Sequence, residues 1–313
     1  MSKILIALGG NALGNTPEEQ KRLVELPAKK IAELSLQGHQ IIVGHGNGPQ
    51  VGMIFNAFSD SHKLNPAHPS MMLPEAGGMS QGYIGFHMIS ALTNAYARLG
   101  VKKDVVYFLT ETVVDKNDIA FKNPSKPVGP FYQTEEEAIS SNPGSVIVED
   151  AGRGYRKVVA SPKPVNFVGI ETIKKVVDTC NATVIVGGGG GVPMIEDDHG
   201  TCIQGVDGVI DKDLALSKIA DMVDADILVI LTAVKWVYVN YRKPDEKKLE
   251  NVTVSELKNY LDGMEFASGS MKPKIEASIK FVEADCKRVA YIGDLNDLSD
   301  ILAGKCGTKI TVR

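Results

Sequence analysis

Short apolar runs recur along the chain, and stretches with the spacing of amphipathic helices separate them. The runs lack the alternation of a half-exposed strand, which is typical of strands that a parallel sheet buries on both faces. They occupy residues 4–8, 40–44, 105–109, 182–186, 227–231 and 289–292. Strands that alternate with helices predict an α/β fold, here a three-layer αβα sandwich with a mostly parallel central sheet.

The interval after the first apolar run begins with a helix start. Thr16, Pro17 and Glu19 stand in the order of an N-cap, a first helical residue and the glutamate of a capping box. We therefore expect one helix from Thr16 to about Gly38.

Two later stretches and the C-terminal residues complete this outline. Residues 59–74 are polar and contain proline and histidine, so we expect an exposed loop there. A helix should open near residue 75 and continue to residue 98, with Ser80 as its candidate N-cap. Residues 308–312 should pair beside the last central strand as an edge element.

The texture of the sequence changes between about residues 116 and 165. The prolines and the glycine at 122–130 exclude a core helix or a central strand. Two short strand patterns, at 145–148 and 157–160, flank a turn at 150–154. These features predict a small protruding subdomain. The sequence alone does not decide whether it is a surface excursion or a lid.

Composition narrows the class of protein. The 313 residues are 43% apolar and 23% charged, which is ordinary for a folded globular chain. A formal net charge of −4 gives no reason to propose a nucleic-acid or anionic-membrane partner. The aliphatic stretch at 227–231 is far too short to span a bilayer, and the N-terminus starts as a strand instead of a signal peptide. We therefore expect a cytoplasmic protein.

The spacing of cysteine and histidine residues argues against a zinc site or a disulfide framework. The four cysteines are far apart and form no CxxC pair. The six histidines show neither HxxxH nor HExxH spacing, so no histidine metal site is expected. Free thiols in a reducing cytosol are the simplest interpretation.

The most distinctive stretch combines glycines, a lysine and two acids. Five consecutive glycines occupy residues 187–191, and Asp211, Lys212 and Asp213 later lead into a helical pattern at 214–223. Glycine-rich turns and helix N-termini present unpaired N–H groups that attract phosphate. The lysine adds a mobile positive charge, and the flanking acids can position it or lie near a metal. This pattern predicts the centre of a phosphoryl-transfer site.

Two further loops have the composition of ligand-facing segments. Gly9 and Gly10 follow the first strand and let the backbone approach a ligand closely, although a plain tight turn is the alternative. The loop at 44–52 is rich in glycine but does not match GxGxxG, because its third glycine falls one place late at Gly52. The missing GxGxxG disfavours a dinucleotide-binding oxidoreductase. No GxxxxGK[ST] occurs either, which disfavours a P-loop protein. We interpret His45 in this loop as a hydrogen-bonding residue, with catalysis as the minor alternative.

A lysine near the C-terminus stands where its charge is unfavourable. Lys274 lies at the start of a helix expected over residues 275–284, where a positive charge opposes the helix dipole. That cost is explained if Lys274 and the helix N-terminus bind the same anion. The role of the neighbouring Lys272 stays open.

Taken together and in this order, these motifs resemble the carbamate kinases of the amino-acid kinase superfamily. The resemblance covers nearly the whole chain and rests on Gly9-Gly10-Asn11-Ala12, the 44–52 loop, Asp211-Lys212-Asp213 and Pro273-Lys274. It implies reversible phosphoryl transfer between ATP plus carbamate and ADP plus carbamoyl phosphate, with the ATP-forming direction serving arginine catabolism. It also implies a homodimer.

The resemblance further implies roles for particular residues. The implied catalytic residues are Lys212, Lys274, Asp213, Lys126, Gly9 and Gly10. The acceptor anion would contact Asn11, Gly46, Asn47 and Gly48. The nucleotide would contact Asp211, Ala233, Val234, Tyr241 and Met271. Mg²⁺ would be bound by the nucleotide phosphates and not by a cage of protein ligands.

The same resemblance divides the chain into two lobes. Residues 1–225 would bind carbamate and include the lid-like subdomain at about 116–165, whereas residues 226–313 would bind the nucleotide. Because carbamate is already an anion, its attack needs no general base, which agrees with the lack of a credible histidine or glutamate base.

Two other functions stay open. Many superfamily relatives carry a lysine two residues before the paired glycines, where this chain has Ala7; Lys212 could supply that charge, as in the carbamate kinase pattern. A kinase of the same superfamily with a carboxylate acceptor is the first alternative, and a substrate panel would separate it. A non-catalytic nucleotide-binding protein is the second, and it would bind nucleotide without turnover.

Overall fold

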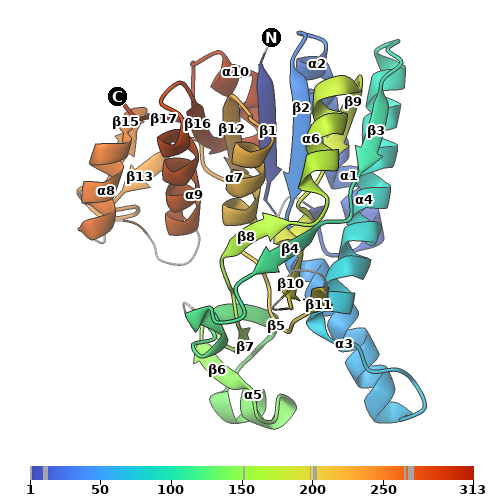
Figure 1. Ribbon diagram of the computed structural model, residues 1–313. Helices are drawn as coiled ribbons and strands as arrows, with labels where there is room; N and C mark the ends of the chain where they lie inside the picture. Colours follow the sequence, from blue (N-terminus) through green and yellow to red (C-terminus); the bar gives the residue numbers. More distant parts are fainter. Residues whose placement is uncertain are drawn as a thin grey trace.

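The computed structural model describes residues 2–9, 13–150, 152–197, 199, 203–263, 266 and 271–313. Its centre is an eight-stranded sheet with the order β15-β17-β16-β12-β1-β2-β9-β3 (Figure 1). All neighbouring pairs are parallel except β16 and β17, so the expected mostly parallel sheet is confirmed. In chain order these strands are β1 (Lys3–Leu8), β2 (Gln40–His45), β3 (Asp104–Tyr107), β9 (Ala182–Ile185), β12 (Ile227–Thr232), β15 (Asn251–Thr253), β16 (Val289–Asp294) and β17 (Thr308–Thr311).

The apolar run of β1 shows why this sheet is buried on both faces. Ile4, Leu5, Ile6 and Ala7 are all fully buried. Because side chains alternate across a strand, Ile4 and Ile6 pack into one core, whereas Leu5 and Ala7 pack into the other. The continuous apolar run is therefore the sequence of a strand between two helical layers.

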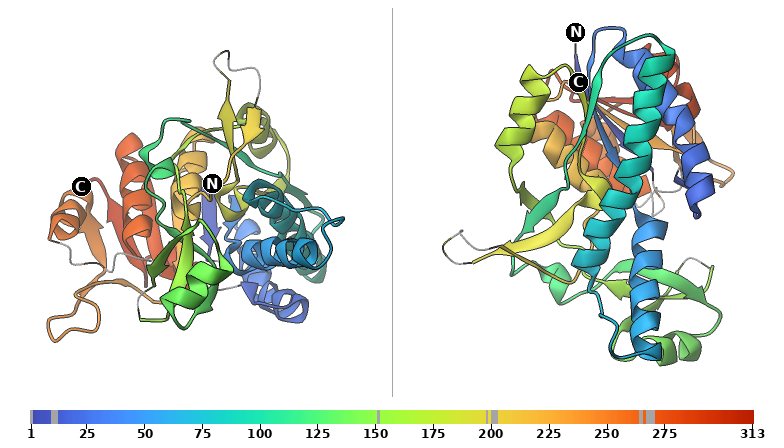
Figure 2. Two further views of the ribbon diagram at one scale, coloured as in Figure 1. Left: turned by 90° about the horizontal axis from the view of Figure 1, so that it is seen from below. Right: turned by 90° about the vertical axis from the view of Figure 1, so that its right-hand side faces the viewer.

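Helices cover both faces of the sheet and complete the three layers (Figures 1 and 2). One core includes side chains of α6 (Ile170–Thr179), α7 (Lys212–Met222), α8 (Val254–Asp262) and α9 (Met271–Ala284). The other core includes α2 (Glu25–Ser35), α4 (Leu73–Arg98) and α10 (Leu298–Leu302). Within the described ranges, no helix has both the length and the apolar character needed to cross a bilayer.

The single helix expected over residues 16–38 is wrong, because the structure has two. Thr16 does cap the first, α1 (Pro17–Leu23), by accepting a hydrogen bond from the Glu19 N–H at 3.2 Å. The helix then breaks at Val24 before α2 begins. Pro27 explains the break, since its ring clashes with the carbonyl four residues earlier in a continuous helix.

The next two expected boundaries also need correction. Helix α3 (Gly48–Leu64) includes part of the expected 59–74 loop. Its buried residues lie only near its start, so its outer turns lack the apolar spacing that reveals a helix. Helix α4 begins at Leu73 after the cap residue Met72, and Ser80 lies buried inside it instead of capping it.

The expected edge position of residues 308–312 is also wrong. Strand β17 lies between β16 and β15, so the short β15 forms that edge of the sheet. Only Val252 of β15 is buried, and a strand this short gives almost no periodic signal.

A separate small sheet projects from the carboxyl ends of the central strands (Figure 1). It has the antiparallel order β5-β7-β6 and carries helix α5. We call residues 126–159 the lid. Its elements are β5 (Lys126–Tyr132), α5 (Glu135–Ser141), β6 (Val146–Glu149) and β7 (Tyr155–Val159). The right-hand view of Figure 2 shows α3 beside this sheet, and the backbone of Gly129 in β5 would lie 3.6 Å from a Cβ added at Gly52 of α3.

Two smaller sheets complete the fold. One has the order β11-β10-β4-β8 and joins the lid to the central sheet. The other is the hairpin of β13 and β14. The bounds are β4 (Glu111–Val114), β8 (Pro164–Phe167), β10 (Val192–Glu196), β11 (Ile203–Gly205), β13 (Val237–Val239) and β14 (Lys247–Leu249), with 3₁₀ turns at Ile119–Phe121, Gly188–Gly190 and Leu295–Asp297.

Candidate active site

A cavity of about 660 Å³ lies where the central strands end and the lid begins. Central strands point toward the lid in Figure 1, and ligands of open α/β sheets bind at this carboxyl edge. The lining comes from the start of α3, from the lid and from the N-termini of α7 and α9. It includes Gly46, Asn47, Gly48, Lys126, Arg153, Arg156, Gly189, Asp211, Lys212, Asp213 and Lys274.

Asp211 starts helix α7 and fixes its first turn. One carboxylate oxygen, Oδ1, accepts hydrogen bonds from the backbone N–H groups of Asp213 at 3.0 Å and Leu214 at 3.2 Å. This is the N-cap arrangement that aspartate favours. Lys212 and Asp213 are therefore the first two residues of the helix, at its positive end.

Asp213 holds two lysines from two helices. Its Oδ1 accepts a hydrogen bond from Lys212 Nζ at 2.5 Å, and its Oδ2 accepts one from Lys274 Nζ at 3.1 Å. Lys274 lies in the first turn of α9, and the two helices are joined further along by a 2.7 Å hydrogen bond from Ser217 Oγ to the Ala277 carbonyl. The packing of α7 against α9 thus brings both ammonium groups to the same carboxylate in the cavity.

Asp213 is an ionised carboxylate in a buried position. Only 5% of its side chain is exposed. Burial alone would raise the pKa of the Asp213 carboxyl, but the charges of Lys212 and Lys274 outweigh burial and lower it to about 2. The carboxylate therefore keeps its charge, and its hold on both lysines, throughout the neutral pH range.

The glycine run at 187–191 packs closely against the loop at 44–52. Gly189 has φ +65°, and a Cβ at this residue would lie 2.2 Å from Cγ of Asn47. A side chain at Gly44 would similarly lie 2.1 Å from Leu216 of α7. A side chain at either place would therefore displace its neighbour, Asn47 or Leu216, and at Gly189 the positive φ also favours glycine.

Polar side chains fix the loops around the glycine run. Asn47 donates a hydrogen bond to Ser80 Oγ at 2.9 Å, which joins the loop at 44–52 to α4. The Gln81 side chain both donates to the Thr110 carbonyl at 3.0 Å and accepts from the Thr110 N–H at 2.8 Å. Thr110 Oγ1 in turn accepts a hydrogen bond from the Gly187 N–H at 2.7 Å. This network explains the polar residues that interrupt the otherwise apolar start of α4.

His45 is a buried hydrogen-bonding residue, as its sequence context predicts. Its Nε2 lies 2.9 Å from the Tyr107 hydroxyl and its Nδ1 lies 2.9 Å from the Gly46 carbonyl. Burial lowers the pKa of the imidazole to about 4, so it is neutral at pH 7. A neutral ring donates from Nδ1 to the carbonyl and accepts from the hydroxyl at Nε2.

The structure brings together eight of the residues predicted for the site. Gly46, Asn47, Gly48, Lys126, Asp211, Lys212, Asp213 and Lys274 all line the cavity. Gly9 directly follows β1 at the same edge, where a Cβ would lie 3.4 Å from the Leu231 carbonyl. Gly10 and Asn11 lie outside the described residues.

Four residues predicted to contact the nucleotide are not part of this lining. Ala233 and Val234 follow β12, and the ring of Tyr241 is exposed with its centroid 5.7 Å from that of Tyr238. Met271 opens α9 and packs against the apolar core. Asp211 does line the cavity, but its carboxylate contacts Lys126 and the α7 backbone.

Two arginines of the lid line the cavity although sequence reasoning missed them. Arg156 donates to Asp150 at 3.1 Å and to the Gly129 carbonyl at 2.9 Å, and its guanidinium lies 4.6 Å from the centroid of the Phe131 ring. Arg153 donates to the same Asp150 at 2.7 Å. The antiparallel pairing of β5 with β7 brings Arg156 to Gly129, and Arg153 lies just before β7, so both arginines line the same cavity as Lys126.

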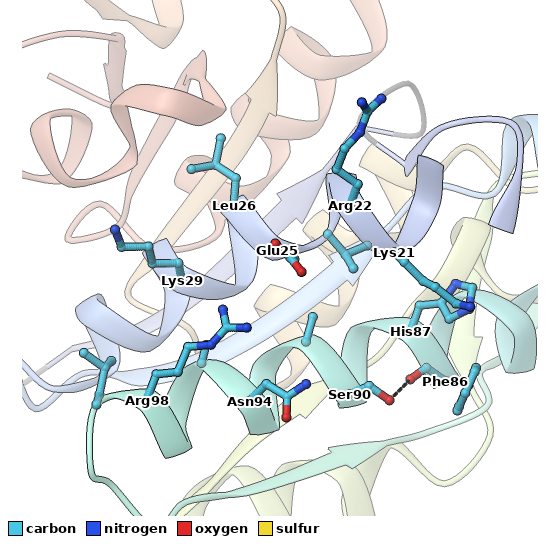
Figure 3. A pocket seen from close by; sticks show the side chains of 14 residues that line it. Lys21, Arg22, Glu25, Leu26, Lys29, Phe86, His87, Ser90, Asn94 and Arg98 are labelled. Atoms are coloured by element: carbon cyan, nitrogen blue, oxygen red, sulfur yellow. Dashed lines mark hydrogen bonds between the residues drawn. The ribbon is translucent and has the colours of Figure 1, made fainter. Parts of the chain in front are cut away.

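A second cavity, of about 570 Å³, is separate from this site (Figure 3). It lies between α1 and α2 on one side and α4 on the other. Its lining includes four basic residues, Lys21, Arg22, Lys29 and Arg98, with Glu25 as the acidic residue among them. Of the residues predicted for phosphoryl transfer that the structure describes, none lies in it.

Comparison with known proteins places the chain in a family. The model of the amino acid kinase family matches residues 2–293, and the chain belongs to this family. Within it the chain is a member of the carbamate kinases. A carbamate kinase-like protein of Mycoplasma pneumoniae is 56% identical over 310 residues, which cover 99% of each chain. The carbamate kinase of Clostridium perfringens is 45% identical over 98% of this chain and 99% of its own.

A solved structure supports the same assignment. Carbamate kinase from Giardia lamblia bound to AMP-PNP is 41% identical, with a TM-score of 0.89 over 99% of this chain and 98% of that one. The α/β fold expected from the sequence is therefore that of a known carbamate kinase. Members of this family are ATP-dependent kinases, which agrees with the phosphoryl-transfer chemistry expected from the lysines and glycines.

Proposed function

We propose that this protein is a carbamate kinase, which reversibly transfers a phosphoryl group from ATP to carbamate to give ADP and carbamoyl phosphate. The observation that carries the proposal is the convergence of Lys212 and Lys274 on the buried Asp213 carboxylate inside the cavity. The carbamate kinases among its relatives support the choice of acceptor.

Lysines would stabilise the phosphoryl group as it passes between donor and acceptor. In the transition state its negative charge spreads over the peripheral oxygens, so catalysis consists mainly of positioning and electrostatic stabilisation. Among the described residues, Lys212, Lys274 and Lys126 supply positive charge at the cavity, and they are paired with Asp213 and Asp211. Arg153 and Arg156 also line it, so the described lining is rich in cations that suit an anionic group.

The acceptor would lie on the loop at the start of α3. Gly46, Asn47 and Gly48 line the cavity there, and we assign the same role to Asn11 and to the backbone of Gly9 and Gly10. Carbamate already carries a deprotonated oxygen, so no base has to remove a proton. His45 could not serve as one, because both of its ring nitrogens are hydrogen-bonded inside the protein.

The nucleotide would bind against the C-terminal lobe. We assign residues 1–225 to the acceptor and residues 226–313 to the nucleotide, with Ala233, Val234, Tyr241 and Met271 along the base. The AMP-PNP complex of the Giardia lamblia enzyme supports a nucleotide site in this fold. The central sheet runs through both parts, since β1 pairs with β2 on one side and with β12 on the other.

Mg²⁺ would accompany the nucleotide. The described residues contain no group of three or more His, Cys, Asp or Glu side chains that could hold a metal ion. Asp211 and Asp213 are also already paired with lysines. Phosphate oxygens and water therefore suit Mg²⁺ better than a protein cage, and the bound ion would offset part of the phosphate charge.

We also propose a homodimer that buries the outer face of α4. Phe86 on this helix is 63% exposed, which is costly for a large apolar side chain in water. Strand β3 beside it is an open edge of the central sheet. Sedimentation equilibrium should give a dimer for the native chain and a monomer for Phe86→Glu; a monomeric native chain would contradict the proposal.

The cellular setting follows from the same assignment. We propose a cytoplasmic enzyme that works in the ATP-forming direction of arginine catabolism. Of the cysteines in the described ranges, Cys180, Cys286 and Cys306 are free thiols, which suits a reducing compartment.

The decisive experiment measures ATP formation from ADP, Mg²⁺ and carbamoyl phosphate, with acetyl phosphate as the control donor. Turnover with carbamoyl phosphate alone is the expected result. Turnover with acetyl phosphate, or with a panel of acyl phosphates, would instead indicate a kinase with a carboxylate acceptor. Saturable ADP binding without any turnover would indicate a non-catalytic nucleotide-binding protein.

A further inference from the structure

The carboxylate of Asp211 contacts two parts of the molecule at once. Its Oδ1 accepts the two backbone hydrogen bonds that cap α7, while its Oδ2 accepts a 2.7 Å hydrogen bond from Lys126 Nζ. Lys126 is the first residue of lid strand β5 and is 85 residues away in the sequence. One side chain therefore joins the lid to the helix end that carries Lys212.

This ion pair lies beside the place where the lid joins the rest of the protein. Lys126 pairs with Val159 across the lid sheet, so the two ends of the lid are adjacent. The next residue, Ala160, accepts a hydrogen bond from the Val209 N–H at 2.9 Å, just before Asp211. The backbone thus anchors the base of the lid, and the Lys126–Asp211 pair determines where the lid lysine lies in the cavity.

We infer that Asp211 is a positioning residue that holds Lys126 of the lid at the N-terminus of α7, ready for the phosphoryl group. The inference rests on the proposed function, because the position of Lys126 matters only if a phosphoryl group is transferred in this cavity. Asp211 acts through Lys126 and through the helix cap, and it needs no contact with the nucleotide.

The strength of the Lys126–Asp211 ion pair determines how much more often the lid should open when the pair is removed. The Lys126 side chain is 38% exposed and that of Asp211 is 14% exposed, so water screens the pair in part. Exposed and partly exposed pairs have coupling energies that correspond to at most about a fivefold change in an equilibrium. Loss of the pair should thus raise the equilibrium constant for lid opening by a few fold without unfolding the lid.

The substitution Asp211→Asn separates the two tasks of this side chain. Asparagine caps helices about as well as aspartate, so α7 should keep its first turn while the charge that holds Lys126 is lost. Lys126→Gln removes the other partner of the pair. Lys122→Gln is the matched control, because Lys122 is an exposed lysine just before the lid.

Hydrogen exchange in the ligand-free protein tests the contact itself. Backbone amides of β5 and β7 should exchange about two- to fivefold faster in Asp211→Asn and in Lys126→Gln than in the native chain. The double variant should show no further increase, and Lys122→Gln should show none. Amides of α7 should be unchanged in Asp211→Asn, which verifies that the cap persists. Equal lid exchange in the native chain and both variants would overturn the inference.

A kinetic double-mutant cycle tests the role in catalysis. Both single variants should lower kcat for ATP formation, and the double variant should be no slower than the more impaired single one. Additive losses would show that Asp211 does not act through Lys126. Because the exchange measurement needs no substrate, it remains decisive if carbamoyl phosphate proves not to be the substrate, so the two proposals can fail separately.

Discussion

Lys212 and Lys274 donate to opposite oxygens of the Asp213 carboxylate, although the two lysines belong to different helices. The distances are 2.5 Å and 3.1 Å, and 61 residues separate Lys274 from Asp213. Two cations that would otherwise repel each other are thereby held together inside the cavity. Their combined charge, set at the N-termini of α7 and α9, is the basis of the predictions that follow.

Replacing Lys212 with alanine should lower kcat for ATP formation by roughly 10²–10³-fold, which is the usual loss for one preorganised donor to a transition state. The thermal midpoint should also fall, because the buried Asp213 carboxylate loses one of the two lysines that offset its burial, so kcat is measured well below that midpoint. Steady-state kinetics with ADP and carbamoyl phosphate measure the effect. Lys175→Ala on the exposed face of α6 is the control. A change under about threefold would remove Lys212 from the mechanism.

Replacing Asp213 with asparagine should affect kcat and KM differently. Both lysines keep their charge but lose their common partner, so kcat should fall by at least about tenfold while KM for carbamoyl phosphate does not rise. Asp221→Asn is a matched control, because Asp221 lies on the same helix but outside the cavity lining. Its carboxylate accepts a 2.6 Å hydrogen bond from Arg288. A large rise in KM with unchanged kcat would show that Asp213 serves substrate binding alone.

The substitutions Gly189→Ala and Gly304→Ala distinguish two effects of an added Cβ. One is backbone strain, and the other is a clash with Asn47 in the loop at 44–52. Both glycines have positive φ, +65° and +71°, but only at Gly189 would a Cβ meet a neighbour, 2.2 Å from Cγ of Asn47. Each substitution should cost about 1 kcal/mol of stability through strain. Only Gly189→Ala should also raise KM for carbamoyl phosphate. We expect an increase of about tenfold, because the added Cβ would displace Asn47 from its contact with the substrate.

Chemical denaturation and steady-state kinetics on both glycine variants measure these effects. Equal KM values for the two variants would show that Asn47 does not contact the acceptor. A rise in KM for Gly304→Ala would show that strain alone reaches the site.

His45 should make stability depend on pH. Burial lowers the pKa of His45 to about 4 from an ordinary value of 6.5, so between these values the unfolded chain binds a proton that the folded chain does not. Stability should therefore fall as the pH decreases from about 6.5 toward 4, by on the order of 3 kcal/mol in total for this group. His45→Gln should remove that part of the slope.

Denaturant unfolding at several pH values measures the slope. His68→Gln is the control for a histidine-to-glutamine change at an exposed position. Burial, and to a smaller extent the charge of Lys21, also lowers the pKa of His87. His87 remains in both variants, so it contributes to the slope in the same direction in each. An unchanged slope in His45→Gln would show that the imidazole is not held neutral.

Local features of the site could be predicted from the sequence because neighbours in the chain decide them. The cap at Asp211, the lysine that follows it and the glycines at 187–191 depend on backbone conformation within one turn or loop. The same holds for the Thr16 cap of α1. Pro27 could also have revealed the break between α1 and α2, since the clash of a proline ring with a carbonyl is local.

The sequence by itself determined the buried strands, the helices between them and the residues able to bind phosphate, because apolar periodicity and capping are short-range effects. Only the tertiary structure decided which of these meet. Lys126 contacts Asp211 across 85 residues, Lys274 contacts Asp213 across 61, and Arg156 lines the cavity through the pairing of β5 with β7. Such contacts depend on strand order and helix packing, which the burial of the whole core fixes and no short stretch of the chain encodes.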